Sequence, residues 1–271
     1  MNINLKNWKS AIVMMGSIAG ILIMSVLGSF AWAGNGNPNP QVMPPHAYPF
    51  GKSYGEWSAE WWKWHLELPA TDHPAFSEDG ANCNVGQSGK VWFLAGAFTN
   101  EVPENEFNTI TRESCSVPTG KAIFFPIINI ECSTIEDPPF RGETRRKLRS
   151  CASSFVEGPN AVAGDLFVEI DSNYLEHLQA YRFQSPVFSF DFEDPDDNIL
   201  GVNCNKEDCD NPLSASDGYW IMLPPLSRGV HFIRFTGSFR DPQSNELLFG
   251  LDVTYELEIV GRKKNRGKAR W

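Results

Sequence analysis

The chain lacks several of the short motifs that mark common catalytic sites. It has no H-E-x-x-H helix for zinc and no C-x-x-C pair. Its short glycine pattern, Gly86-Gln-Ser-Gly89, lacks the length and the helix start that a phosphate-binding loop needs. Histidine is scarce, and the five residues lie at no metal-binding spacing. These absences argue against a zinc enzyme and a nucleotide-binding protein.

Positive charge is in short supply as well. The formal net charge is −10, and a body this acidic repels phosphate backbones, so nucleic acid is not expected as a partner. The exception is the basic segment 262–271, which we predict to be a solvated, disordered tail. Contact between this tail and an anionic envelope surface is the alternative.

Long apolar runs are confined to the N-terminus. Lys6 and Lys9 precede an apolar run over 11–27, and the small-residue sequence Ala31-Trp32-Ala33 follows it. This order is typical of a secretory signal peptide, and the run is shorter than the ~20 residues that cross a bilayer. We expect residues 1–33 to be removed and the mature protein to act in the periplasm or outside the cell, without a transmembrane segment. The absence of an Asn-x-Ser/Thr site fits a bacterial source.

The mature part shows no repeat or linker that would divide it. Residues 34–52 are rich in Pro, Gly and Asn and predict an extended leader. Residues 53–261 have the length of a single domain, and the basic tail follows. The sequence does not indicate the oligomeric state.

Six cysteines in an exported chain predict three disulfides. The last two bracket a short acidic loop and are expected to pair locally, and the other pairings are hypotheses among many. The predicted pairs are Cys204–Cys209, Cys83–Cys115 and Cys132–Cys151.

Alternation of apolar and polar residues predicts a mainly β protein. It is clearest over 249–259, which indicates a strand with one buried and one wet face. The run 121–131 is mostly apolar and is typical of a strand covered on both faces, with Pro126 at a bulge or an edge. The strands 219–223 and 230–239 are predicted to form an antiparallel pair around a long turn. Together these patterns favour an antiparallel β-sandwich, jelly-roll or immunoglobulin-like, with two flanking helices; the second helix is expected over 141–157.

The first helix is predicted over Ser53–Leu68, and it is unusually rich in tryptophan. Ser53 and Glu56 have the spacing of a capping box, and Pro69 ends the helix. Trp57, Trp61 and Trp64 follow one stripe and Trp62 falls opposite, so the helix has two apolar faces.

One face should dock on the sheets, and the second must be covered by neighbouring loops or by a ligand. Indole rings stack well on sugars and other flat groups. The candidate ligand-binding residues are Trp61, Trp62, Trp64, His65 and His73.

Several longer segments resemble an uncharacterised family of exported bacterial proteins. They are GKSYGEWSAEWWKWHLELP, CNVGQSGKVWFLAG, CSVPTGKAIFFPIINIEC and GYWIMLPPLSRGVHFIRFTG, and the resemblance extends over most of 46–260. It implies an envelope or extracellular setting and carries over no catalytic residues.

Two pairs of acidic residues are candidates for glycoside hydrolysis. Glu169 and Asp171 match the first half of the E-x-D-x-x-E pattern of jelly-roll endoglucanases, although the second Glu is missing. Asp252 and Glu256 share one strand face, where plain wet-face alternation explains them equally well.

Asp194, Asp196 and Asn198 have the 1, 3, 5 spacing of a calcium loop. The glycine and the final glutamate of a helix–loop–helix site are absent, so the choice lies between a structural calcium in a β-loop and a solvated turn. No other cofactor is indicated.

These observations favour a non-catalytic exported protein that binds carbohydrate or another envelope component through an aromatic surface. A secreted polysaccharide hydrolase and a purely structural envelope protein are the alternatives.

Overall fold

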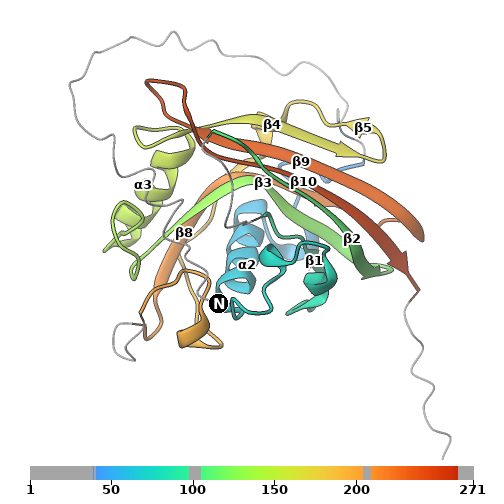
Figure 1. The fold of residues 1–271 in the computed structure, drawn as a ribbon, viewed down its shortest axis with the longest axis horizontal. Helices are drawn as coiled ribbons and strands as arrows, with labels where there is room; N and C mark the ends of the chain where they lie inside the picture. Colours follow the sequence, from blue (N-terminus) through green and yellow to red (C-terminus); the bar gives the residue numbers. More distant parts are fainter. Residues whose placement is uncertain (1–38, 40, 98–104, 204–208, 262–271) are drawn as a thin grey trace, which may run out of the picture.

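The computed structural model describes residues 39, 41–97, 105–203 and 209–261. Over these residues the protein is mainly β, with two α-helices and two five-stranded sheets of mixed strand orientation (Figure 1). The predicted signal peptide and basic tail lie outside the described residues. No helix among the described residues has the length and apolarity that a bilayer crossing requires.

The first sheet has the strand order β1-β3-β8-β6, and β7 also pairs with β8. Its strands are β1 (Val91–Phe93), β3 (Ala122–Ser133), β6 (Arg182–Gln184), β7 (Phe188–Ser189) and β8 (Leu213–Leu223). The register between β3 and β8 shifts between Pro126 and Ile128. Pro126 therefore lies at a bulge of a central strand, one of the two positions predicted for it.

The second sheet has the order β2-β10-β9-β4-β5. Its strands are β2 (Asn108–Pro118), β4 (Val162–Ile170), β5 (Asn173–Tyr174), β9 (Gly229–Arg240) and β10 (Leu247–Val260). The alternation predicted for 249–259 is confirmed over 251–259, because Leu251, Val253, Tyr255, Leu257 and Ile259 are buried and the residues between them are less so; Phe249 is only partly buried.

The expectation of purely antiparallel sheets is wrong at two places. β1 pairs with β3 in parallel, and β2 pairs with β10 in parallel. The chain leaves the first sheet after β1, forms β2 in the second sheet and returns to the first as β3, so β1 and β3 are not joined by a hairpin. The predicted pairing of 219–223 with 230–239 is also wrong, because β8 and β9 belong to different sheets and Pro224–Arg228 joins them.

Strand β3 is covered on both of its faces, as its apolar sequence predicts. The ring of Phe125 lies 5.0 Å from that of Phe235 on β9, and the ring of Phe124 lies 6.0 Å from that of Tyr54 on the first helix. Gly237 allows the two sheets to approach, because a Cβ there would lie 2.6 Å from the Cβ of Ile128. In Figure 1 the second sheet lies above β3 and the helix below it.

That helix, α2 (Tyr54–Glu67), contacts β8, β6 and β3. The predicted capping box is present, since the Glu56 amide donates to the Ser53 hydroxyl and the Ser53 amide donates to the Glu56 carboxylate. The second helix, α3 (Arg145–Val156), begins at Thr144 and contacts β8 and β3. It is shorter at its N-terminus than the predicted 141–157.

Two predicted disulfides are confirmed: Cys83–Cys115 and Cys132–Cys151. The first joins a 3-10 turn to β2, and the second joins β3 to α3. Cys209 is also disulfide-bonded, and its predicted partner Cys204 lies outside the described residues.

Candidate functional site

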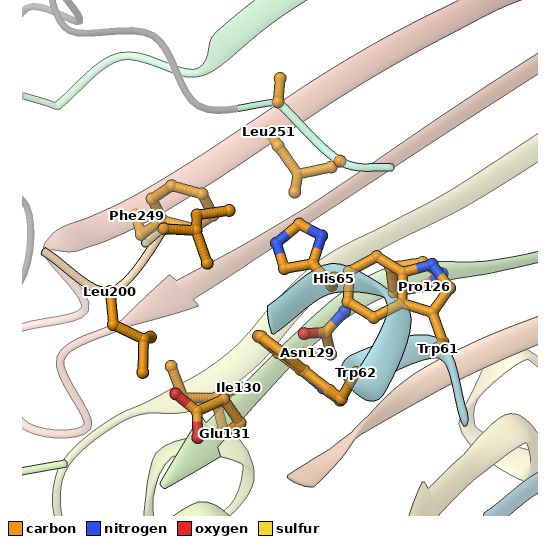
Figure 2. A pocket seen from close by; sticks show the side chains of 13 residues that line it. Trp61, Trp62, His65, Pro126, Asn129, Ile130, Glu131, Leu200, Phe249 and Leu251 are labelled. Atoms are coloured by element: carbon orange, nitrogen blue, oxygen red, sulfur yellow. The ribbon is translucent and has the colours of Figure 1, made fainter. Parts of the chain in front are cut away.

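A hollow lies where α2 meets both sheets. The empty space within it, counted out to open solvent, is about 690 Å³. Figure 2 shows Trp61, Trp62 and His65 from α2 on one side and Leu200 and Phe249 on the other. The lining residues are Trp61, Trp62, His65, Gly96, Ala97, Pro126, Asn129, Ile130, Glu131, Ile199, Leu200, Phe249 and Leu251.

The three tryptophans near the hollow differ in how their indole N–H groups are used. Trp61 donates to the carbonyl of Leu94 at 2.9 Å, and Trp64 donates to the carbonyl of Val85 at 3.0 Å. The Nε1 of Trp62 is buried, and it has no hydrogen-bond partner among the described residues. Because the Trp62 side chain lines the hollow, this unmet donor belongs to the wall of the hollow.

Two polar side chains of β3 join this lining. Asn129 and Glu131 lie two residues apart on the strand, and both line the hollow. Glu131 is 2% exposed, and its carboxylate accepts a hydrogen bond from the Ser214 hydroxyl at 2.8 Å. The remaining lining is almost entirely apolar, which is the usual composition of a ligand pocket with a few orienting polar groups.

His65 is neutral in this environment. Its ring stacks on Trp61 with 4.4 Å between centroids, and its side chain is 2% exposed. Burial holds its pKa well below the ordinary 6.5, and the neighbouring His73 lowers it further. A neutral imidazole beside indole rings keeps this wall of the hollow uncharged near neutral pH.

His73 is buried behind His65. Its Nδ1 accepts a hydrogen bond from the Ala75 amide at 3.0 Å, so its Nε2 carries the proton and donates to the His65 carbonyl at 2.9 Å. Burial lowers the pKa of His73 to about 4. The side chain therefore fixes the loop after α2 against the helix.

A fully buried arginine, which the sequence patterns do not reveal, holds the loops behind the hollow. Arg112 on β2 is 0% exposed. Its guanidinium lies within hydrogen-bond distance of five acceptors, and no carboxylate is among the partners that the described residues provide. The acceptors are the carbonyls of Ala75, Ser77, Ala95 and Gly96 and the hydroxyl of Tyr255.

The structure brings Trp61, Trp62 and His65 of the predicted ligand set into one pocket. Trp64 and His73 lie close to them, 6.3 Å apart by ring centroids, but do not line the hollow. All five side chains are at most 7% exposed, so α2 presents no open aromatic face. No sequence pattern indicates that β10 and the 199–200 segment complete this site.

The carboxylate Asp171 is held by the neighbouring strand. It follows β4 with a positive φ of 48°, and its two oxygens contact the Nδ1 of His231 at 2.6 Å and the amide of Phe232 at 2.9 Å. Glu169 lies earlier on β4, opposite Arg234 of β9.

The second acidic pair is widely spaced. Asp252 accepts two hydrogen bonds from Arg234. These bonds keep the pKa of Asp252 below its ordinary value, although partial burial acts to raise it. Glu256 is four residues further along β10, so the two Cα atoms are separated by about 13 Å. That exceeds the roughly 5–10 Å between carboxylates in glycosidases.

The acidic 194–198 segment is internally bonded. The Asp194 carboxylate accepts from the Asp196 amide at 3.0 Å, and the Asn198 side chain bonds to Pro195 and Val202. Within the described ranges, no cluster of three or more His, Cys, Asp or Glu side chains is arranged to hold a metal ion.

No protein-family model matches the chain, and no curated protein matches it. Among solved structures, a cysteine protease inhibitor from Entamoeba histolytica is 12% identical, with 57% of this chain and 96% of that chain covered and a TM-score of 0.20. A likeness at this level carries no argument about fold or function.

Proposed function

We propose that the protein is an exported, non-catalytic binding protein that holds a small, mainly apolar molecule in the hollow beside Trp62. The observation that carries this proposal is the buried Trp62 Nε1, which has no partner among the described residues and belongs to an apolar pocket. Export is supported by the disulfides and by the signal-like N-terminal sequence. Membership of the exported bacterial family and a jelly-roll or immunoglobulin-like sandwich topology remain predictions.

The lining defines the chemistry of the ligand. Apolar contacts with Ile130, Leu200 and Phe249 supply most of the affinity, since each 100 Å² of buried apolar surface is worth about 2.5 kcal/mol. A hydrogen-bond acceptor on the ligand would pair with the Trp62 N–H, which otherwise leaves a buried donor unmet at a cost of about 1–3 kcal/mol. We expect a molecule with an apolar body and a carbonyl or similar acceptor.

The solvatochromic naphthyl ketone prodan is a suitable probe, because it combines an apolar body with one carbonyl. Its emission should shift to the blue and saturate at one molecule per chain. Leu200→Trp, which fills the rim, should weaken binding at least about tenfold. Leu226→Trp, at a partly buried leucine outside the lining, should not.

The Trp62 N–H is tested by comparing two ligands. Trp62→Phe should weaken the binding of prodan by about fivefold to tenfold, because it removes one buried hydrogen bond. The same change should weaken the binding of naphthalene, measured by competition, much less. The proposal fails if prodan does not saturate, or if the two leucine variants behave alike. Such a failure would favour a purely structural role for α2.

A further inference from the structure

The outer face of the second sheet carries a cluster of exposed apolar side chains. We call Phe167, Tyr174, Val230 and Phe232 the aromatic platform. Tyr174 is 66% exposed, Phe232 is 51% exposed and Val230 is 50% exposed. Large apolar side chains gathered on one face commonly mark a contact surface.

Strand register places these side chains on one face. Tyr174 of β5 lies opposite Glu169 of β4, and Glu169 lies opposite Arg234 of β9. Phe232 is two residues from Arg234 on β9 and therefore points the same way. The residues between them, Ile170 and Ile233, are buried on the inner face.

Polar groups lie between the rings. The Arg234 guanidinium lies 5.5 Å from the Phe167 ring centroid and is fixed by two hydrogen bonds to Asp252, at 2.9 and 2.7 Å. The Phe167 and Tyr174 rings are 5.6 Å apart. Arg234 thus presents hydrogen-bond donors and Glu169 presents acceptors beside flat apolar surfaces. The ion pair with Asp252 holds the Arg234 side chain in place before a ligand binds.

We propose that the aromatic platform binds a neutral polysaccharide chain laid across strands β5, β4 and β9. Sugar rings combine apolar C–H faces with hydroxyl groups at their edges, which matches rings alternating with a guanidinium and a carboxylate. Tyr174 and Phe232 are separated by two strand spacings, about 10 Å across the sheet, which leaves room for successive sugar units. The site is separate from the pocket beside Trp62 and does not depend on it.

The charge of the protein and the area of the aromatic platform favour a neutral polysaccharide over other partners. The net charge of −10, together with Glu169, Asp252 and Glu256 on this face, repels anionic polymers. Fully buried aromatic side chains cover about 150–250 Å² each, so these partly exposed residues offer on the order of 300 Å². A stable protein dimer needs about 800 Å² per partner, so a second copy of this chain is a poor fit.

Affinity electrophoresis of the mature chain tests the proposal, with gels containing hydroxyethylcellulose, glycol chitin, a β-1,3-glucan or galactomannan, and with polygalacturonate as the anionic comparison. At least one neutral polymer should retard the protein, with little effect of salt, and polygalacturonate should not. Tyr174→Ala combined with Phe232→Ala should weaken retardation at least about tenfold. Tyr48→Ala removes a tyrosine that is 71% exposed and outside the platform, and should have no effect.

Three results would overturn the proposal: no retardation by any neutral polymer, equal loss in the Tyr48→Ala control, or retardation by polygalacturonate alone. Sedimentation of the wild-type chain and the double variant provides a further check. A dimer that the double variant abolishes would assign this face to self-association instead. Because all substituted side chains are exposed, an unchanged thermal transition should confirm that both variants fold.

Discussion

The imidazole of His65 lies almost parallel to the indole of Trp61, with an angle of 18° between the rings and 4.4 Å between their centroids. The His73 ring meets His65 edge-on, also at 4.4 Å. Two histidines are therefore buried in contact with each other and with aromatic carbon. Protonation of either one would place a charge in a site that has little to solvate it.

Acidification should destabilise the fold below about pH 6.5. In the unfolded chain each histidine has a pKa near ~6.5, whereas burial lowers the pKa of His73 to about 4 and that of His65 well below 6.5. The unfolded state then binds more protons as the pH falls, so the free energy of unfolding falls too. The stabilisation is complete above this window and declines by up to about 1.4 kcal/mol per pH unit for each histidine.

Urea unfolding measured from neutral pH down to about pH 4, the pKa of His73, would show how the free energy of unfolding depends on pH. His73→Gln should flatten this dependence, because one of the two depressed pKa values is removed. His46→Gln, at an exposed position, is the matched control and should leave it unchanged. Identical slopes in all three proteins would contradict the assignment.

Trp61→Phe should destabilise the protein more than Trp62→Phe. Both changes remove a similar indole area, but only Trp61 donates to a backbone carbonyl, that of Leu94. Loss of that bond leaves a buried acceptor unpaired and should add about 1–2 kcal/mol to the cost. Urea unfolding of the two variants measures the difference, and a larger loss for Trp62→Phe would contradict it.

Arg112→Met should destabilise the protein by about 3 kcal/mol or more, because the carbonyls of Ala75, Ser77 and Gly96 lose this donor in a buried site. Tyr255→Phe removes only the hydroxyl that contacts the same guanidinium and Ala95, and should cost about 1 kcal/mol. Chemical denaturation separates the two. Equal costs would mean that the carbonyl contacts contribute little.

Replacing Cys132 and Cys151 together by Ser should lower the free energy of unfolding by about 3 kcal/mol, as expected for a crosslink between residues 19 apart in sequence. The bond attaches α3 to β3, so hydrogen exchange in α3 should rise more than in α2. Equal exchange in both helices would argue that α3 is held mainly by its apolar face, which includes Leu148 and Phe155.

Local signals were strong enough to predict several elements. Ser53 and Glu56 specify the start of α2 through neighbours three residues apart, and the alternation in β10 specifies its buried face. These two predictions depend on short-range chemistry. The confirmed disulfide pairs Cys83–Cys115 and Cys132–Cys151 join cysteines 32 and 19 residues apart, and the sequence offered them only as hypotheses among many pairings.

Features that depend on residues far apart in the sequence could not be predicted from it. The burial of Arg112 depends on carbonyls of loops that lie 16 or more residues away, and a charged side chain in a strand is normally exposed. The pocket beside Trp62 needs β10 to lie close to α2, which no local pattern indicates. The parallel pairs also follow from the order in which the chain visits the two sheets, not from the composition of any strand.

The position of β10 within its sheet has a consequence for biogenesis. This strand lies between β2 and β9 and comes after every other strand of the described residues. Until it emerges from the ribosome or the export channel, β2 has no partner in its sheet and β9 has one open edge. The second sheet can therefore be completed only after residues 247–260 are available, which would suit the proposed export of the chain in an unfolded state.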